Sequence, residues 1–443
     1  MADIKPFKGT RYNISMIEDL QKVIAPPYDV VSKDKREVLY ERHPNNVIRL
    51  ILGKDNPSDD DYNNKYNRAA NYLQSWRSEG VLIDDEIDSL YFYEQEFSLP
   101  NGENKKRSGF FTLVKLESLE DGKIKAHERT FMGPKADRLK LIRATKSNLS
   151  PIFSLYTDKD FFIDSVIKER AKKKPWLQCT DDEGVVHKIW VVKESKVIAQ
   201  IIDSMKNRTL FIADGHHRYE TALIYRNEIT DMGNIKSNDP CQYVMMCLIN
   251  TENEGLVVLP THRVLNADLN ADVEEVLNDL GEHFTLTKME GINYNNPDET
   301  EKEIVDKMAK IKTTSYVMLL PKNEAYLLEL KKKANLNSLI EGEMSELKKK
   351  LDVTILQEYL IKQVWIGNPE IELDEEDIKY VKDIKEAVAL VNKGKASAAF
   401  IMNAPNLEMI KKIAEAGERM PEKTTYFYPK LGTGLVMRDM SIK

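Results

Sequence analysis

Short apolar runs alternate with helix-forming patterns through the middle of this 443-residue chain. The runs His187–Val192 and Thr209–Ala213 predict buried strands, and Gln242–Leu248 predicts a third. Helices are predicted over Glu194–Met205 and from His216 to about Ile229. Because strands that alternate with helices form sheets covered by helices, we expect a mixed α/β (α+β) fold rather than an all-helical one.

The length predicts two or three domains, since a domain takes roughly 150 residues. We expect an N-terminal α/β lobe over 1–120, a core over 121–266 and a C-terminal α/β lobe with an extended tail over 267–443. In the first lobe, Ser89–Phe97 and Gly109–Leu116 predict a hairpin. The apolar run Val47–Leu52 predicts a buried strand that ends at Gly53.

Composition narrows the class of protein. The formal net charge of -7 argues against a nucleic-acid partner, since such proteins usually carry a basic excess. The sequence contains no run of about 18 apolar residues that would span a membrane, and its start lacks a secretory signal. Cys179, Cys241 and Cys247 are too widely spaced for a CxxC metal site. We therefore expect a cytoplasmic protein.

One strand-to-helix turn carries an unusual set of side chains. The predicted strand ends at Asp214, and Gly215, His216, His217 and Arg218 open the next helix. The backbone N–H groups of a helix start have no intrahelical partners and form the positive end of the helix dipole. A glycine lets a ligand approach the backbone, and a cation at this end is unfavourable unless an anion compensates it. The turn therefore predicts a phosphate site.

Two other interpretations of the same turn remain open. In the first, Asp214 is an ordinary N-cap, the two histidines are exposed and Arg218 pairs with a surface carboxylate. In the second, His216 and His217 bind zinc. Zinc is the weaker interpretation, because neighbouring side chains diverge on a helix and no third ligand is evident in the sequence.

A second cluster joins His127 and Glu128 to Asp137 and Arg138, which lie on the helix predicted after Pro134. A carboxylate in a turn before a helix can act as a general base if its surroundings bring its pKa toward the working pH. An ordinary surface pair is the alternative for this cluster.

A third cluster, Thr261, His262 and Arg263, follows the apolar run Leu256–Leu259. Polar and basic side chains at the end of a strand are well placed for a site beside the sheet. They are equally typical of a solvated loop, so this further candidate site and the loop remain two open interpretations.

Several blocks of the sequence resemble a large prokaryotic family of unknown function, which is related to the free serine kinases of the ParB/sulfiredoxin-like superfamily. The resemblance to the large family runs from Lys5 to about Val436, and that to the kinases rests on the HE and DGHHR blocks. The blocks are APPYDVV, NVIRL, HERTFMGPKADRLKLIRATKSNLSPIFSLY, ADGHHRYETAL, PTHRV and MPEKTTYFYPKLGTGLV.

The resemblance implies a ParB/sulfiredoxin-like nucleotide-binding core with additional N- and C-terminal lobes. It implies a kinase that uses ATP or ADP with Mg²⁺ to phosphorylate the hydroxyl of free L-serine, giving O-phosphoserine. Carried over residue by residue, it assigns Glu128 as the base with His127 beside it, Asp214 as a Mg²⁺ ligand, and Gly215, His216, His217 and Arg218 as the phosphate turn.

Two rival functions remain. The first is a non-catalytic regulatory protein that binds ATP or CTP in the manner of ParB-like clamps. The second is a scaffold whose turn is empty. Neither a Walker A sequence nor the protein-kinase signature set occurs in the sequence, so a kinase of this kind needs another design. Besides nucleotide and small-molecule substrate, a second copy of the chain is an expected kind of partner.

Overall fold

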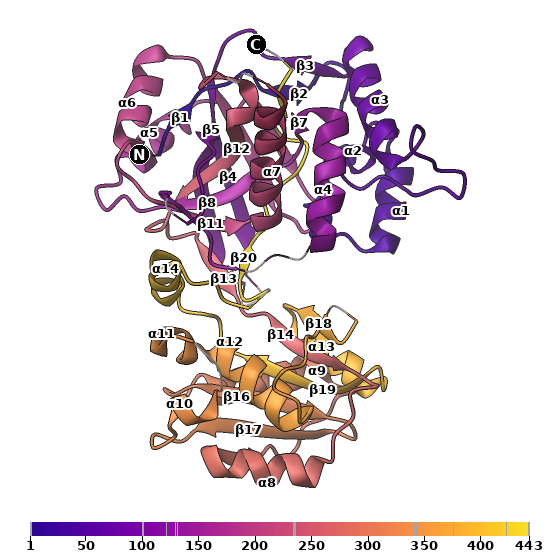
Figure 1. Ribbon diagram of the computed structural model, residues 1–443, viewed down its shortest axis with the longest axis vertical. Helices are drawn as coiled ribbons and strands as arrows, with labels where there is room; N and C mark the ends of the chain where they lie inside the picture. Colours follow the sequence, from indigo (N-terminus) through magenta and orange to yellow (C-terminus); the bar gives the residue numbers. More distant parts are fainter. Residues whose placement is uncertain are drawn as a thin grey trace. The chain divides into compact units, whose positions relative to one another are not determined.

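The computed structural model describes residues 2–99, 102–120, 122–128, 130, 132–233, 236–340, 344–374, 376–421 and 423–441. The chain divides into two compact units. Unit 1 comprises Met1–Ala126, Thr130–Val257 and Phe427–Lys443, and unit 2 comprises His127–Arg129 and Val258–Tyr426. Each unit has its own sheet (Figure 1).

The sheet of unit 1 has nine strands, in the order β6-β11-β8-β12-β5-β4-β10-β9, with β1 paired to β5. It is mixed, because β11 pairs with β6 in parallel and with β8 antiparallel. The strands are β1 (Ile4–Lys5), β4 (Leu90–Ser98), β5 (Asn104–Lys115), β6 (Ile124–Lys125), β8 (Ile152–Tyr156), β9 (Leu177–Thr180), β10 (Val186–Val192), β11 (Leu210–Asp214) and β12 (Tyr243–Asn250).

Helices cover this sheet, and α4 and α7 lie side by side against it (Figure 1). The helices of unit 1 are α1 (Lys33–Arg42), α2 (Ile48–Ile51), α3 (Lys65–Ser78), α4 (Met132–Thr145), α5 (Phe162–Arg170), α6 (Ser195–Met205) and α7 (His216–Met232), with single turns η1 (Leu20–Lys22), η2 (Tyr28–Val30) and η3 (Pro240–Gln242). Short strand pairs join β2 (Thr10–Tyr12) to β3 (Leu82–Asp84) and β7 (Ser147–Asn148) to β21 (Arg438–Asp439).

Unit 2 is built on a six-stranded sheet in the order β15-β17-β16-β19-β14-β18, in which every pair is antiparallel. Its strands are β14 (His262–Asn266), β15 (Phe284–Lys288), β16 (Ser315–Leu320), β17 (Glu324–Leu330), β18 (Ile378–Val381) and β19 (Ala396–Met402). Its helices are α8 (Val273–His283), α9 (Pro297–Met308), α10 (Leu336–Leu339), α11 (Glu346–Lys349), α12 (Asp352–Thr354), the π-helix η4 (Ile355–Trp365), α13 (Ile384–Asn392) and α14 (Leu407–Glu415). The chain changes unit at 126–127 and 129–130, and again within β13 (Val257–Leu259) and β20 (Tyr426–Tyr428).

The central strand β16 shows why unit 2 is layered on both sides. Successive side chains of a strand point to opposite faces of the sheet. Tyr316 and Met318 pack in one hydrophobic core, whereas Val317 and Leu319 pack in the other. Because β16 carries apolar side chains on both faces, helices must cover both faces of the sheet to bury them.

These elements confirm the predicted mixed α/β fold, including the hairpin of β4 and β5 and the strand-to-helix passage from β11 to α7. Strands from the predicted ranges 1–120 and 121–266 share one sheet, since β5 pairs with β12. The three-part division of the chain stays a prediction. In the described ranges, no helix is both long and apolar enough to cross a membrane.

The strand predicted at Val47–Leu52 is wrong, because this run forms the short helix α2. The Asn46 side chain accepts a hydrogen bond from the N–H of Ile48 at 2.9 Å, and the N–H of Leu52 donates to the carbonyl of Ile48 at 2.8 Å. Ile48, Leu50 and Ile51 are all buried. A run that is buried on every side has the same apolar pattern as a strand and as a helix, so periodicity alone does not separate them.

Gly109 provides a test of the unit 1 sheet. A Cβ atom at this position of β5 would lie 2.4 Å from the backbone carbonyl oxygen of Leu248 on β12. We expect Gly109→Ala to destabilise the protein by about 1–3 kcal/mol, since the neighbouring backbone cannot move aside. Gly133→Ala in α4 is the control, because a Cβ there meets nothing within 4 Å. Thermal unfolding measures both, and equal midpoints for the two variants would contradict the packing described.

Candidate functional site

The predicted turn lies between β11 and α7 in unit 1, and its geometry requires a glycine. Gly215 is the N-cap of α7 and has a φ of 92°, a left-handed conformation that side chains disfavour. A Cβ atom at Gly215 would also lie 2.9 Å from the guanidinium of Arg218. The glycine therefore lets the arginine fold back over the start of its own helix.

The buried carboxylate of Asp214 holds two cations. Arg218 Nη2 lies 2.7 Å from Oδ2, and Lys430 Nζ forms an ion pair with Oδ1. All three side chains are only 12–13% exposed. Burial by itself would raise the pKa of Asp214, but the positive charges of Lys430 and Arg218 outweigh it and hold the pKa below its ordinary value of 3.8. Asp214 is therefore ionised at neutral pH.

This arrangement replaces the simple capping interpretation. The N-cap residue of α7 is Gly215 and not Asp214, and a glycine has no side chain to make a capping hydrogen bond. Arg218 does pair with a carboxylate, but that carboxylate is the buried Asp214 and not a surface group. Two cations surround one carboxylate at the positive end of a helix dipole, so the turn carries an excess of positive charge suited to an anion.

The other residues of the turn contribute further groups. His216 is buried, and its charge contributes to the lowered pKa of Asp214. His217 is half-buried. The Arg218 guanidinium also donates to the carbonyl of Pro151 at the start of β8, which fixes its direction. The described residues contain no cluster of three histidine, cysteine or acidic side chains with metal-site geometry.

Lys430 is the member of this ion-pair cluster that the sequence did not predict. It lies in the C-terminal segment that belongs to unit 1, and hydrogen bonds to the backbone hold this segment in place. The Gln95 side chain donates to the carbonyl of Lys430 at 3.0 Å. The buried Arg107 donates to the carbonyl of Tyr428 at 3.0 Å and to the carbonyl of Pro429. The YPKLGTG block contains this lysine, but no spacing rule links residues 216 positions apart.

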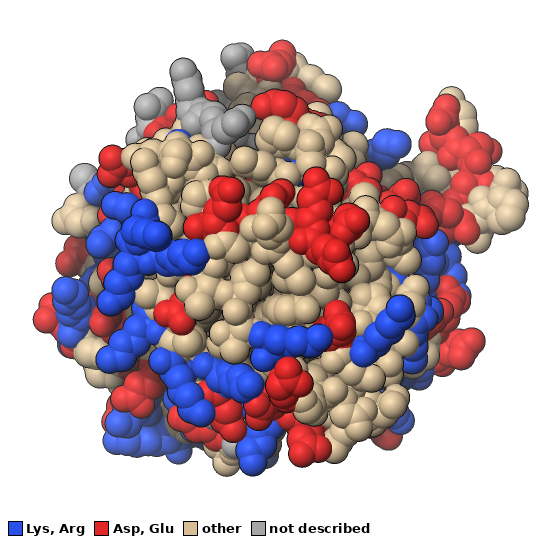
Figure 2. Space-filling model, turned by 90° about the horizontal axis from the view of Figure 1, so that it is seen from below, with Lys and Arg blue, Asp and Glu red and all other residues tan. Residues whose placement is uncertain are grey.

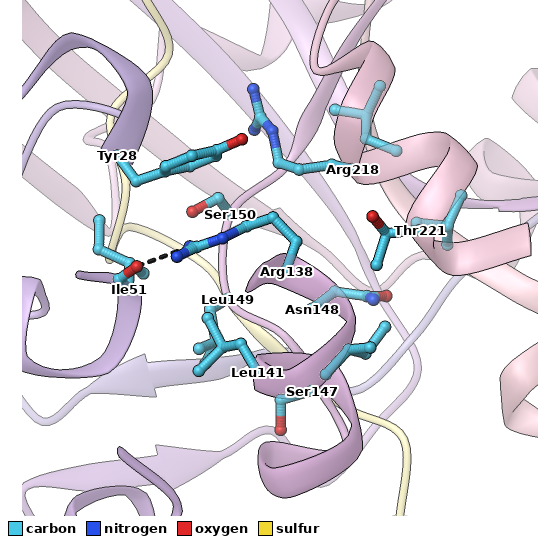
Figure 3. A pocket seen from close by; sticks show the side chains of 13 residues that line it. Tyr28, Ile51, Arg138, Leu141, Ser147, Asn148, Leu149, Ser150, Arg218 and Thr221 are labelled. Carbon is cyan, nitrogen blue, oxygen red and sulfur yellow. Dashed lines mark hydrogen bonds between the residues drawn. The ribbon is translucent and has the colours of Figure 1, made fainter. Parts of the chain in front are cut away.

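A pocket adjoins the turn on the side of α4 (Figure 3). Its volume is about 60 Å³, and Arg218 lines it. The Arg138 guanidinium stacks on the ring of Tyr28 with its carbon 4.0 Å from the ring centre, and it donates to the carbonyl of Ile51 at 2.6 Å. The Thr221 hydroxyl, which also lines the pocket, is 2% exposed and has no hydrogen-bond partner among the described residues. A small polar ligand would satisfy it.

Burial raises the pKa of Tyr28 to about 12, so its hydroxyl remains a neutral donor and acceptor at physiological pH. Asp137, predicted beside Arg138, accepts a hydrogen bond from Tyr66 at 2.8 Å and pairs with Arg138. It therefore orients the Arg138 side chain but does not itself line the pocket.

His127 and Glu128 lie in unit 2, where Thr425 fixes both of them. Glu128 Oε1 accepts hydrogen bonds from the backbone N–H of Thr425 at 3.0 Å and from its hydroxyl at 2.8 Å. The His127 Nε2 atom lies 3.1 Å from the same hydroxyl and 3.7 Å from Glu128 Oε1. The pair is therefore an ordered, mostly buried cluster, and the surface alternative is wrong.

The third cluster lies inside unit 2, so the solvated-loop interpretation is wrong. Thr261, His262 and Arg263 are all buried at the start of β14. Burial, with the charge of Arg263, lowers the pKa of His262 to about 3, so the imidazole is neutral at physiological pH. Burial lowers the pKa of Arg263, while the carboxylate of Glu128 acts in the opposite direction. This places a positive charge electrostatically close to Glu128.

The structure thus groups the predicted residues in two sets. Unit 1 contains the turn with Arg138 nearby, joined by Lys430, and unit 2 contains the Glu128 cluster and β14. The assignments of Glu128 as a base and of the turn as a phosphate site remain predictions.

Three solved structures illustrate what this chain is similar to. A free serine kinase in complex with AMP is 14% identical, with a TM-score of 0.33, over 71% of this chain and 86% of the other. A conserved hypothetical protein from Pyrococcus furiosus is 15% identical, with a TM-score of 0.32, over 72% and 93%. C-terminally truncated SbnI from Staphylococcus aureus is 10% identical, with a TM-score of 0.35, over 72% and 84%.

A search of curated proteins gave no match. The family described as "Protein of unknown function (DUF1015)" matches residues 4–354, which is most of the chain. This match confirms the family of unknown function expected from the sequence blocks. The chain belongs to the DUF1015 family.

Proposed function

We propose that this protein is a nucleotide-dependent small-molecule kinase whose β11–α7 turn holds the phosphates of ATP or ADP. The observation that carries the proposal is the ion-pair cluster in which Lys430 and Arg218 share Asp214 at the uncapped start of α7. The resemblance of the DGHHR and HE blocks to free serine kinases supports phosphoryl transfer and makes free L-serine the acceptor.

Phosphoryl transfer needs positioning and charge neutralisation more than covalent chemistry. A bond forms between the acceptor hydroxyl oxygen and the terminal phosphorus, and the bond from that phosphorus to the leaving nucleotide oxygen breaks. Arg218, Lys430 and the N–H groups that begin α7 stabilise the charge on the phosphate oxygens. The resemblance to the kinases makes Glu128 the base that takes the proton of the serine hydroxyl, and O-phosphoserine is the product. His127 assists by holding the orientation of this cluster.

Asp214 is the residue of the turn that would hold Mg²⁺. Its ionised carboxylate is a hard oxygen ligand of the type that Mg²⁺ prefers, and Mg²⁺ keeps several of its waters in protein sites. Since both oxygens already accept from cations, Asp214 suits contact through a metal-bound water. The ion would supply additional neutralisation of the phosphate charge.

The acceptor is tested directly by incubating the purified protein with Mg²⁺, L-serine and either ATP or ADP. We expect O-phosphoserine to form with at least one nucleotide, and mass spectrometry detects it. Reactions without serine are the control. Nucleotide binding without product from either nucleotide would exclude the kinase and favour the regulatory alternative, in which the turn switches a partner.

The role of Glu128 is tested by Glu128→Gln, which keeps the shape of the side chain but removes the proton acceptor. We expect turnover to be lost while nucleotide affinity stays within about threefold, because the base acts in the chemical step and not in phosphate binding. Calorimetry gives the affinity and product formation gives the turnover. Activity that survives the change would show that another group takes the proton.

The role of Lys430 is tested by Lys430→Ala and Lys430→Arg. We expect the alanine variant to bind ADP about tenfold or more weakly while binding adenosine as before, because the lost contact is a charge-assisted bond to phosphate. The arginine variant should recover most of the ADP affinity. Lys172→Ala removes an exposed lysine of unit 1 and serves as the control. An equal loss for ADP and adenosine would instead indicate a purely structural role for Lys430.

A further inference from the structure

A second cavity in unit 1 lies among basic and aromatic side chains and plays no part in the proposed reaction. It has a volume of about 210 Å³. Its lining includes Arg11, Arg170, Lys174, Lys193, Trp176 and Trp190. Arg11 comes from β2, Arg170 from the end of α5 and Trp190 from β10, and the two lysines lie in the loops before β9 and after β10. One cavity thus receives four cations from separate elements.

Arg11 is held rigidly and still has an unused donor. Its Nε lies 2.8 Å from Oδ2 of Asp85, its Nη2 pairs with Oδ1, and its guanidinium carbon lies 3.7 Å from the centre of the Trp176 ring. The residue is 6% exposed. Its Nη1 atom is buried and has no hydrogen-bond partner within the described part of the chain.

Arg170 also lines the cavity and is held in a similar way. Its Nη1 donates to Oε1 of Glu194 at 2.7 Å, and its Nη2 donates to the carbonyl of Val191 at 2.8 Å. Its Nε is also buried without a partner among the described residues. Buried donors without partners are rare in folded proteins because they have lost water and gained nothing in exchange. Two at one cavity indicate a ligand that accepts hydrogen bonds.

The charges around the cavity favour an anion. Among the described residues, none that lines the cavity is acidic. Asp85 and Glu194 pair with the guanidiniums of Arg11 and Arg170 but do not line the cavity. Lys174 and Lys193 are exposed and add positive charge to the lining. The Arg11 guanidinium covers one face of the Trp176 ring, so that face is not available for stacking with a ligand.

We propose that this cavity is a binding site for a small phosphate-bearing anion, separate from the β11–α7 turn. A phosphate group carries up to two negative charges and three acceptor oxygens, which suits two fixed guanidiniums and two flexible ammonium groups better than a single carboxylate does. A nucleic acid is the less suitable partner, because the chain carries a net charge of -7. On the face shown in Figure 2, basic and acidic side chains are interspersed.

The experiment titrates the full-length Arg218→Ala protein with inorganic pyrophosphate, inorganic phosphate and a short single-stranded RNA. The Arg218 change weakens anion binding at the turn, so the remaining signal reports the cavity. We expect one pyrophosphate to bind, and tryptophan fluorescence to change because Trp176 and Trp190 line the site. Absence of phosphate and pyrophosphate binding at millimolar concentration would overturn the proposal, and so would RNA binding more tightly than pyrophosphate.

Charge reversal then locates the site. Lys174→Glu with Lys193→Glu should lower pyrophosphate affinity by about tenfold or more, because it replaces two attractions by two repulsions. The control is Lys172→Glu with Lys196→Glu, which makes the same change in net charge at exposed lysines that do not line the cavity. We expect this control to lower pyrophosphate affinity by at most about threefold. Equal losses in the two double variants would overturn the assignment. Thermal unfolding of each variant verifies that its fold is intact.

Discussion

The ion-pair cluster of Asp214, Arg218 and Lys430 connects features that are far apart in the sequence. A buried carboxylate is costly unless it is paired, and removing one partner of such a pair leaves an uncompensated charge. Asp214 at the end of β11 therefore needs both cations, and Gly215 must be a glycine so that Arg218 can reach back to it. The C-terminal segment is needed as well, because it carries Lys430 into unit 1.

The same cluster explains how positive groups remain together before an anion arrives. Arg218, Lys430 and the start of α7 would repel one another in the absence of a negative charge. Asp214 compensates them and fixes their directions, so little reorganisation is needed when phosphate oxygens approach. The carboxylate has a second consequence: an incoming phosphate competes with Asp214 for the same cations, so binding is weaker and more reversible than it would be at bare cations. Under the proposed function, this reversibility suits a turn that releases a nucleotide after each transfer.

Local chemistry allowed the site to be predicted only where its residues are close in sequence. The strand-glycine-helix pattern of residues 211–218 predicted β11, α7 and the turn, because the pattern and the conformation span the same few residues. It did not predict Lys430, whose position depends on Arg107 and Gln95 fixing the backbone of a distant segment. It likewise left open whether residues 261–263 are solvated, since burial of β14 depends on strands that follow more than a hundred residues later. For the helix α2 the local pattern itself is ambiguous, because a run of buried apolar residues fits a strand as well as a helix.

The two basic clusters of unit 1 place their carboxylates differently, and this difference bears on what each can do. At the turn, Asp214 lies between its two cations and occupies a donor of each. At the cavity, Asp85 holds Arg11 from behind and leaves Nη1 directed to no protein acceptor among the described residues. A carboxylate between cations competes with a ligand, whereas one behind a guanidinium orients it without occupying its remaining donors. The proposed phosphate site at the turn is therefore suited to an anion that enters and leaves, and the proposed site at the Arg11 cavity to an anion that stays bound.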